Sequence, residues 1–104
     1  MDNKVLIGSL MEESWLTLEQ MAAICQVEHE WLLRHIDEGL FPQIESVAGI
    51  WRFSSPMVSR ARRMRWIERD FDAVPELAAL VADLLEEMDT LRKQLAQRSP
   101  DWPL

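Results

Sequence analysis

The chain has 104 residues, 48% of them hydrophobic, and a formal net charge of −7. This length predicts a single domain whose core needs no crosslinks, and the one cysteine, Cys25, excludes an internal disulfide. The N-terminus lacks a basic region followed by a long apolar stretch, and no apolar run approaches the length of a membrane span. We therefore expect a cytoplasmic protein that does not enter membranes.

Charge is unevenly distributed along the chain. Residues 1–51 contain nine acidic and two basic side chains, residues 52–69 contain six arginines and one glutamate, and residues 70–104 contain eight acidic and three basic side chains. This pattern predicts that oppositely charged segments neutralise one another within the fold or across a dimer. It also predicts an acidic face that is open to a basic partner.

The first predicted elements are a short edge strand at residues 5–7 and a helix from Thr17 to about Cys25. Thr17 can cap this helix while Gln20, three residues later, bonds back to it, which is a capping box. The apolar positions repeat at helical spacing and predict one buried stripe. Its members are Leu18, Met21, Ala22 and Cys25.

A second helix is predicted at residues 29–38, directly after a tight turn at 26–28. Gly39 follows at the position where helices commonly end in the left-handed conformation. The apolar side of this helix comprises Trp31, Leu32, His35 and Ile36. Two closely spaced helices of this kind predict a helix-turn-helix.

A β-hairpin, the wing, is predicted from residues 44–48 and 50–53, which flank a glycine. The next helix is expected to begin with Ser55 as its cap and Pro56 at its first position, and to run to about Arg69. The fold class predicted from these elements is mainly α, a winged helix-turn-helix with a small wing and a long C-terminal helix.

The last helix is predicted from Pro75 to about Gln97, so that residues 1–74 form the body, 75–98 a C-terminal heptad helix and 99–104 a flexible tail. Its apolar residues step by four and three, a heptad pattern, and comprise Leu77, Val81, Leu84, Met88, Leu91 and Leu95. A helix of about 35 Å would overhang a three-helix body. We therefore predict a homodimer, parallel or antiparallel, that uses Leu84, Met88, Leu91 and Leu95.

Catalytic and metal-binding patterns are weak in this sequence. Cys25 lies in an apolar helical run and is interpreted as a buried small hydrophobe. His29 and His35 are six residues apart and would point to different sides of a helix, which disfavours zinc. Phosphate-binding glycine motifs are missing from the sequence. We expect no enzyme activity and no cofactor.

The predicted second helix carries the wrong charge for DNA. In a helix-turn-helix this helix enters the major groove, and lysine and arginine meet the phosphates. Here the helix and the turn before it contain Arg34 as the one basic residue beside four acids, Glu28, Glu30, Asp37 and Glu38. Acids repel a polyanion, so nucleic-acid binding is disfavoured. The arginines of the third helix could touch phosphates, but we expect them to form exposed pairs with the acidic helices, worth some tenths of a kcal/mol each.

Several segments together resemble a known family. Residues 16–41, LTLEQMAAICQVEHEWLLRHIDEGLF, resemble the first two helices of MerR-type regulators. The wing residues around Trp51, the basic helix RARRMRWIERDF and the last helix LVADLLEEMDTLRKQL are similar to the chaperone-modulator family CbpM. That resemblance implies binding to the J-domain of a CbpA-like co-chaperone. It also implies competition with the Hsp70 partner, DnaK, and restraint of the co-chaperone and DNA-binding activities.

The functional hypothesis is thus a protein-binding modulator whose acidic face meets a basic helix. Five tryptophans among 104 residues also favour a binding role, because tryptophan is enriched at binding centres. The candidate partner-binding residues are Glu19, Glu28, Glu30, Trp31, Arg34, Asp37 and Glu38. The alternatives are a MerR-like DNA-binding transcriptional regulator and a purely structural dimer module.

Overall fold

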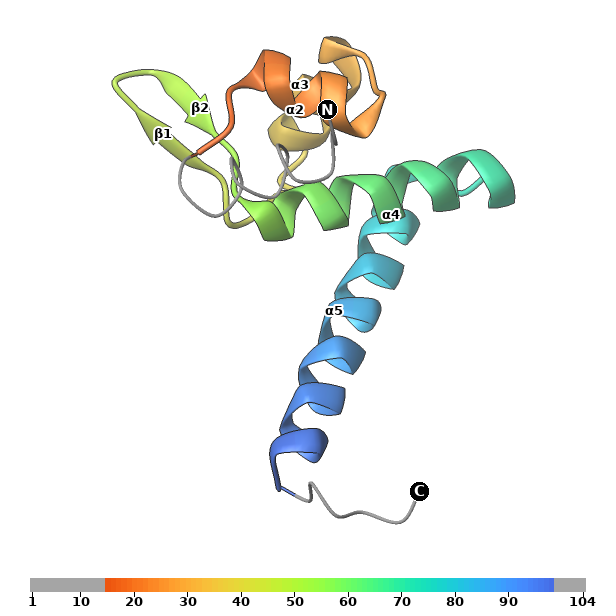
Figure 1. Cartoon of the computed structure of the whole chain (residues 1–104). Coiled ribbons are helices and arrows are strands. Elements are labelled where there is room, and N and C mark those ends of the chain that lie inside the picture. The colour runs from red at the N-terminus through yellow and green to blue at the C-terminus, as the bar shows by residue number, and fades with distance from the viewer. Residues whose placement is uncertain (1–14, 99–104) are drawn as a thin grey trace, which may run out of the picture.

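The computed structural model describes residues 15–98 and contains four α-helices and a two-stranded antiparallel sheet in that range (Figure 1). The elements are α2 (Leu18–Cys25), α3 (His29–Asp37), β1 (Glu45–Val47), β2 (Ile50–Arg52), α4 (Ser55–Phe71) and α5 (Pro75–Arg98). The mainly α, winged helix-turn-helix fold class is confirmed. The strand expected at residues 5–7 and the tail at 99–104 lie outside the described residues.

Helix α2 begins as its sequence predicts. The hydroxyl oxygen of Thr17 accepts from the backbone N–H of Gln20 at 3.1 Å, and the Gln20 side-chain oxygen accepts from the backbone N–H of Thr17 at 2.9 Å. This capping box satisfies two N–H groups that the first turn leaves unpaired. Met21, Ala22 and Cys25 are buried, and Leu18 is half-buried against the core.

Helices α2 and α3 end in the same way, and the end of α2 sets the tight turn between the two helices. Gln26 and Gly39 adopt left-handed conformations, with φ of 56° and 75°. The N–H of the following residue then reaches back five positions, to Ala22 O at 3.1 Å after α2 and to His35 O at 2.9 Å after α3. This is the Schellman arrangement. Gly39 therefore terminates α3 as predicted. The last helical residue is Asp37, one residue before the expected end at Glu38.

The wing is a short hairpin. Strands β1 and β2 pair antiparallel, with Val47 opposite Ile50. Ala48 and Gly49 between them both have positive φ, 53° and 78°, as a type I′ turn requires. The strands are shorter than predicted. Beyond them the pairing is replaced by an isolated bridge, in which Phe53 and Leu16 exchange backbone hydrogen bonds of 2.9 and 3.0 Å.

The prediction that Ser55 caps α4 is wrong by one residue. Ser54 has the extended backbone of a cap, and its carbonyl accepts from the N–H groups of Met57 and Val58. Ser55 is therefore already helical, and Pro56 lies in the first turn, where a missing N–H breaks no helical bond. The helix continues to Phe71, past the expected end.

The core is built around α4. This helix packs against α2 and against the start of α5, and its buried apolar side chains form part of the core. The buried apolar residues of the described chain are Leu16, Met21, Ala22, Cys25, Leu32, Phe41, Phe53, Met57, Val58, Ala61, Met64, Ile67, Ala78, Ala79 and Ala82.

Helix α5 leaves the body and extends away from it (Figure 1). It packs on α4 through three buried alanines, Ala78, Ala79 and Ala82. Small side chains let two helix backbones approach closely. The predicted heptad stripe lies on a different face of α5, and most of its side chains are exposed. Its exposed residues are Leu77, Leu84, Met88, Leu91 and Leu95.

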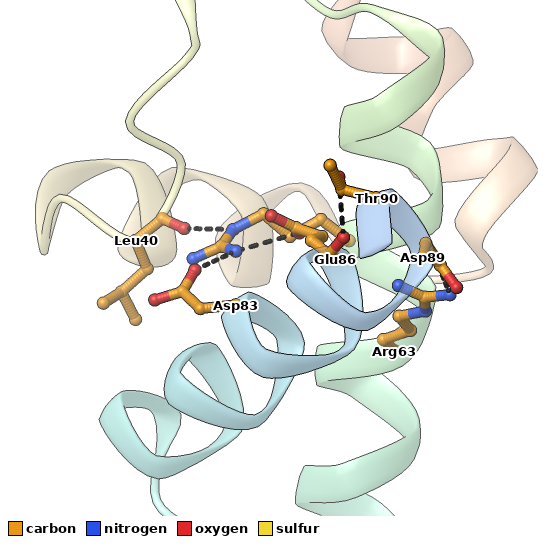
Figure 2. A network of polar contacts seen from close by, with 7 residues as sticks. Leu40, Arg63, Asp83, Glu86, Asp89 and Thr90 are labelled. Atoms are coloured by element: carbon orange, nitrogen blue, oxygen red, sulfur yellow. Dashed lines mark hydrogen bonds and ion pairs between the residues drawn. The ribbon is translucent and has the colours of Figure 1, made fainter. Parts of the chain in front are cut away.

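Arg60 ties α5 to the rest of the body. Figure 2 shows this network with the partners Leu40, Asp83 and Glu86 labelled. The Arg60 side chain is 4% exposed, and its Nε donates to the Leu40 carbonyl at 2.8 Å. Its Nη1 donates to Asp83 at 2.6 Å and to Glu86 at 3.0 Å, both on α5. One guanidinium thus joins the loop after α3, helix α4 and helix α5. We call these four residues the Arg60 clamp.

Another ion pair, between Arg63 and Asp89, lies beside the clamp. Arg63 donates to Asp89 at 2.7 Å, and this hydrogen bond lowers the pKa of the Asp89 carboxyl (Figure 2). The expected pairing of arginines with acidic helices therefore holds for Arg60 and Arg63, with the partners on α5. The expectation that such pairs are exposed is wrong for Arg60, which is buried because α5 and the loop after α3 cover it.

Candidate functional site

A groove runs between the α2–α3 turn and helix α4. It consists of two adjoining hollows of about 400 and about 330 Å³, which share Gln26 and Arg65. The first is lined by Gln26, Val27, Glu28, Glu30, Trp31, Arg34 and Arg65. The second is lined by Ile24, Cys25, Gln26, Arg62, Arg65, Trp66 and Arg69. We call the two together the turn groove.

The first hollow brings together four of the residues that the sequence singled out for partner binding. Glu28 and Glu30 supply an acidic rim, and Trp31 and Arg34 stand beside them. Glu28 is the N-cap of α3, yet its side chain makes no capping hydrogen bond, so its carboxylate is available to the groove.

The other three candidates lie elsewhere. Glu19 is exposed in the first turn of α2, and Asp37 and Glu38 are exposed at the end of α3. None of the three lines the turn groove. The structure therefore divides the predicted acidic face into a rim at the groove and a set of outlying charges.

Trp31 is held in place by a buried polar cluster. Its ring stacks on His35, with centroids 3.8 Å apart, and its indole N–H donates to Glu68 at 3.2 Å. The other oxygen of Glu68 lies 2.7 Å from His35 Nε2, while His35 Nδ1 lies 2.6 Å from the Trp31 carbonyl oxygen. Both ring nitrogens of His35 thus face oxygen atoms, which fixes the orientation of the imidazole. The half-buried indole is consequently a fixed wall of the groove.

Sequence reasoning placed His35 on the apolar side of its helix, and its side chain is indeed 1% exposed. It missed Glu68, which is 33 positions away on α4. Glu68 is the one acid among six arginines in residues 52–69, and that isolation is the signal that could have marked it.

The second hollow is bordered by an arginine row. Arg62, Arg65 and Arg69 are spaced by three and four, so they share one side of α4. Arg62 donates to the Ile24 carbonyl at 3.2 Å, and Arg69 donates to Asp70 at 2.9 Å, which lowers the pKa of that carboxyl. Within residues 15–98, Arg65 forms neither a hydrogen bond nor an ion pair.

Cys25 also lines this hollow. The thiol is buried, as expected, and burial raises its pKa to about 11, although the charge of Arg62 acts in the opposite direction. A nucleophilic cysteine needs a lowered pKa, because the thiolate is the reactive form. Cys25 therefore serves as a packing residue in this groove.

A second unusual surface lies where α4 meets α5, and it shares Trp66 with the turn groove. An apolar hollow of about 490 Å³ forms where α4 meets α5, lined by Trp66, Ile67, Phe71, Ala73, Leu77, Val81 and Leu85. The exposed heptad residues Leu84, Met88, Leu91 and Leu95 continue from it along α5. An apolar surface of this extent is typical of an interaction site.

Within residues 15–98, no group of three or more potential ligands could hold a metal ion. In the same part of the chain, no helix is both long and apolar enough to cross a membrane.

A known family matches residues 16–98, almost the whole described chain, and its description is MerR HTH family regulatory protein. The chain belongs to this MerR helix-turn-helix family. The MerR match covers the helix-turn-helix, the wing and the long helix together. No curated protein and no solved structure matches the chain significantly.

In a helix-turn-helix protein the second helix is the DNA-reading element, which here is α3. In this MerR-family chain the exposed charges of α3 and its cap are acidic apart from Arg34, and comprise Glu28, Glu30, Asp37 and Glu38. The reading helix is thus present, but its charge is opposite to what a phosphate backbone attracts.

Proposed function

We propose that this protein is a non-enzymatic modulator that binds the J-domain of a CbpA-like co-chaperone. In this proposal it inhibits the co-chaperone and DNA-binding activities of that partner by competing with the Hsp70 protein DnaK. The observation that carries the proposal is the acidic rim of the turn groove, Glu28 and Glu30, beside the fixed indole of Trp31. The MerR family supplies the scaffold, and the resemblance to CbpM supplies the partner.

The binding mechanism follows from the rim. A basic helix of the partner places its ammonium or guanidinium groups against Glu28 and Glu30. The methylene groups of these basic side chains pack on the ring of Trp31. This ring loses little conformational freedom on binding, because Glu68 and His35 already hold it in place. Charged rim contacts of this kind accelerate association and weaken as salt is added.

We also propose that two copies pair through α5. The residues are those predicted from the heptad, Leu84, Met88, Leu91 and Leu95, whose exposed fractions are 57, 44, 53 and 51%. The support is that the body uses the alanine face of α5, which leaves the leucine face uncovered in a single chain. The turn groove is lined by other elements, the α2–α3 turn, α3 and α4.

A MerR-like DNA-binding regulator is the second candidate. The arginine row on α4 favours it. The wing favours it less, because Arg52 lies over the ring of Trp15 with its guanidinium carbon 4.6 Å from the centroid. An arginine held in a cation–π contact is less free to reach a phosphate.

Calorimetric titration tests the proposal. We expect the protein to bind the isolated J-domain at low salt, to bind more weakly at moderate salt, and to show no heat with duplex DNA. Binding to duplex DNA together with silence towards the J-domain would overturn the proposal in favour of the regulator.

A pair of matched double variants locates the binding face. Glu28→Gln with Glu30→Gln removes two charges at the groove, and Asp37→Asn with Glu38→Gln removes two charges away from it. We expect the first double variant to weaken J-domain binding about tenfold or more and the second to weaken it much less. Equal losses would show that net charge alone drives the association.

A further inference from the structure

The turn groove has a basic half that its proposed use does not explain. Arg62, Arg65 and Arg69 line the hollow next to the acidic rim, and Arg65 lines both hollows. Two other arginines of α4, Arg60 and Arg63, have a structural role, because they form ion pairs with acids of α5. In the arginine row, Arg62 donates to the Ile24 carbonyl and Arg69 pairs with Asp70, whereas Arg65 forms no hydrogen bond or ion pair within the described residues.

We infer that the arginine row binds a carboxylate-bearing segment of a protein partner, so that the turn groove receives a helix of mixed charge. Basic groups of that helix meet Glu28 and Glu30, and its acidic group meets the arginines. This inference rests on the proposed function in taking the occupant to be a protein, and it adds the chemistry of the second half of the site.

The groove's geometry supports a carboxylate at Arg65. Arg65 is half-buried and lines both hollows, so a ligand that bridges them lies against this side chain. A guanidinium presents its N–H donors in a fork that matches the two oxygens of a carboxylate. Trp66 flanks the same hollow with an exposed ring, which can cover the apolar part of the bound side chain.

Charge selects an acidic peptide over a nucleic acid. Phosphates repeat along a nucleic-acid strand, so a strand lying in the groove would bring phosphates to the rim as well as to the row. Glu28 and Glu30 repel them there, and the chain as a whole carries a net charge of −7. A peptide can place its acidic side chain at the row and a basic one at the rim.

A titration of the full ¹⁵N-labelled protein with hexaglutamate, followed by amide chemical shifts, tests the inference without any J-domain. We expect saturable shifts centred on residues 62–69 and on Gln26, with a dissociation constant on the order of 1 mM. Arg65→Ala should weaken this binding about tenfold. The matched control Arg92→Ala removes an arginine on α5 whose side chain is 71% exposed, and it should leave the binding unchanged.

The double variant of the acidic rim should change the affinities for hexaglutamate and for the J-domain in opposite directions. Glu28→Gln with Glu30→Gln should strengthen hexaglutamate binding, because it removes repulsion, although the same change should weaken J-domain binding. Equal effects of Arg65→Ala and Arg92→Ala, shifts without saturation, or stronger shifts of residues 62–69 with duplex DNA would each overturn the inference. Hexaglutamate binding without J-domain binding would refute the proposed partner and leave the basic half of the groove established.

Discussion

The two sides of α4 use the same residue type for different ends. On the side packed against α5, Arg60 and Arg63 meet acids at 2.6 to 3.0 Å, and Arg60 is buried. On the side facing the turn groove, Arg62, Arg65 and Arg69 border an open hollow. The difference teaches that some arginines of this helix stabilise the fold and others are open to a partner. The surroundings of each arginine, and not its residue type, decide which of the two roles it can have.

The largest expected effect lies on the packed side. Asp83→Asn with Glu86→Gln leaves the buried guanidinium of Arg60 without a counter-charge, which should lower the free energy of unfolding by about 3 kcal/mol. Urea denaturation measures this change. The control is Asp70→Asn, which removes the acid paired with the exposed Arg69 and should leave the midpoint unchanged. If both variants unfold alike, the Arg60 clamp is not a stabilising contact.

The next effect concerns the outer face of α5. Leu84→Glu should convert a dimer to a monomer, because it places a charge in the middle of the proposed apolar seam. The monomer should keep its helical circular dichroism, since the Leu84 side chain is 57% exposed in a single chain. Sedimentation equilibrium measures the mass, and Gln94→Glu, an exposed position off the stripe, is the control. A monomeric wild-type protein would end the dimer proposal.

On the groove side, the raised pKa of Cys25 predicts a pH effect. Below pH 9, the thiol's ordinary value, folding is favoured by keeping this buried thiol neutral, and that stabilisation is lost as pH rises from 9 through about 11. Iodoacetamide labelling of the folded protein should accordingly be slow at pH 8 and accelerate toward pH 11. Arg62→Ala should move the acceleration to still higher pH, because the charge of Arg62 lowers this pKa. Rapid labelling at pH 8 would contradict the buried, neutral thiol.

The smallest expected effect is at the turn that forms the groove's junction. Gln26 has a left-handed backbone with φ of 56°, which costs a residue with a side chain about 1 kcal/mol or more. Gln26→Gly should therefore raise the free energy of unfolding by about 0.5 kcal/mol after the added flexibility of glycine is subtracted. Ala48→Gly in the wing turn, with φ of 53°, is a matched comparison. A destabilised Gln26→Gly variant would show that the glutamine side chain stabilises the turn.

Local signals in the sequence predicted most of the fold. The capping box at Thr17, the glycine after α3 and the period of the apolar residues each depend on neighbours within a few positions. The cap of α4 was misplaced because Ser54 and Ser55 are adjacent and chemically equal. The backbone conformation decides between them, since Ser54 is extended and directly follows Phe53, which is bridged to Leu16.

The site was predicted less completely, because its parts meet through tertiary packing. Charge along the sequence marked Glu28 and Glu30, but it did not separate them from the acids that lie away from the groove, which are Glu19, Asp37 and Glu38. Glu68 supports Trp31 from a position 37 residues away in the sequence. Arg60 is likewise buried by a contact with Leu40, which is 20 residues away. The alanines that pack α5 against α4 were not predicted, because small residues give a weaker apolar signal than the heptad leucines of the same helix.

The measurement that tests the central claim most directly is a competition assay. ATP hydrolysis by DnaK is stimulated with the J-domain of a CbpA-like co-chaperone and then titrated with this protein or with its Glu28→Gln, Glu30→Gln variant. The account predicts that the wild-type protein abolishes the stimulation, and that the variant needs about tenfold more protein to do so. Undiminished stimulation at saturating wild-type protein would contradict a modulator that competes for the J-domain.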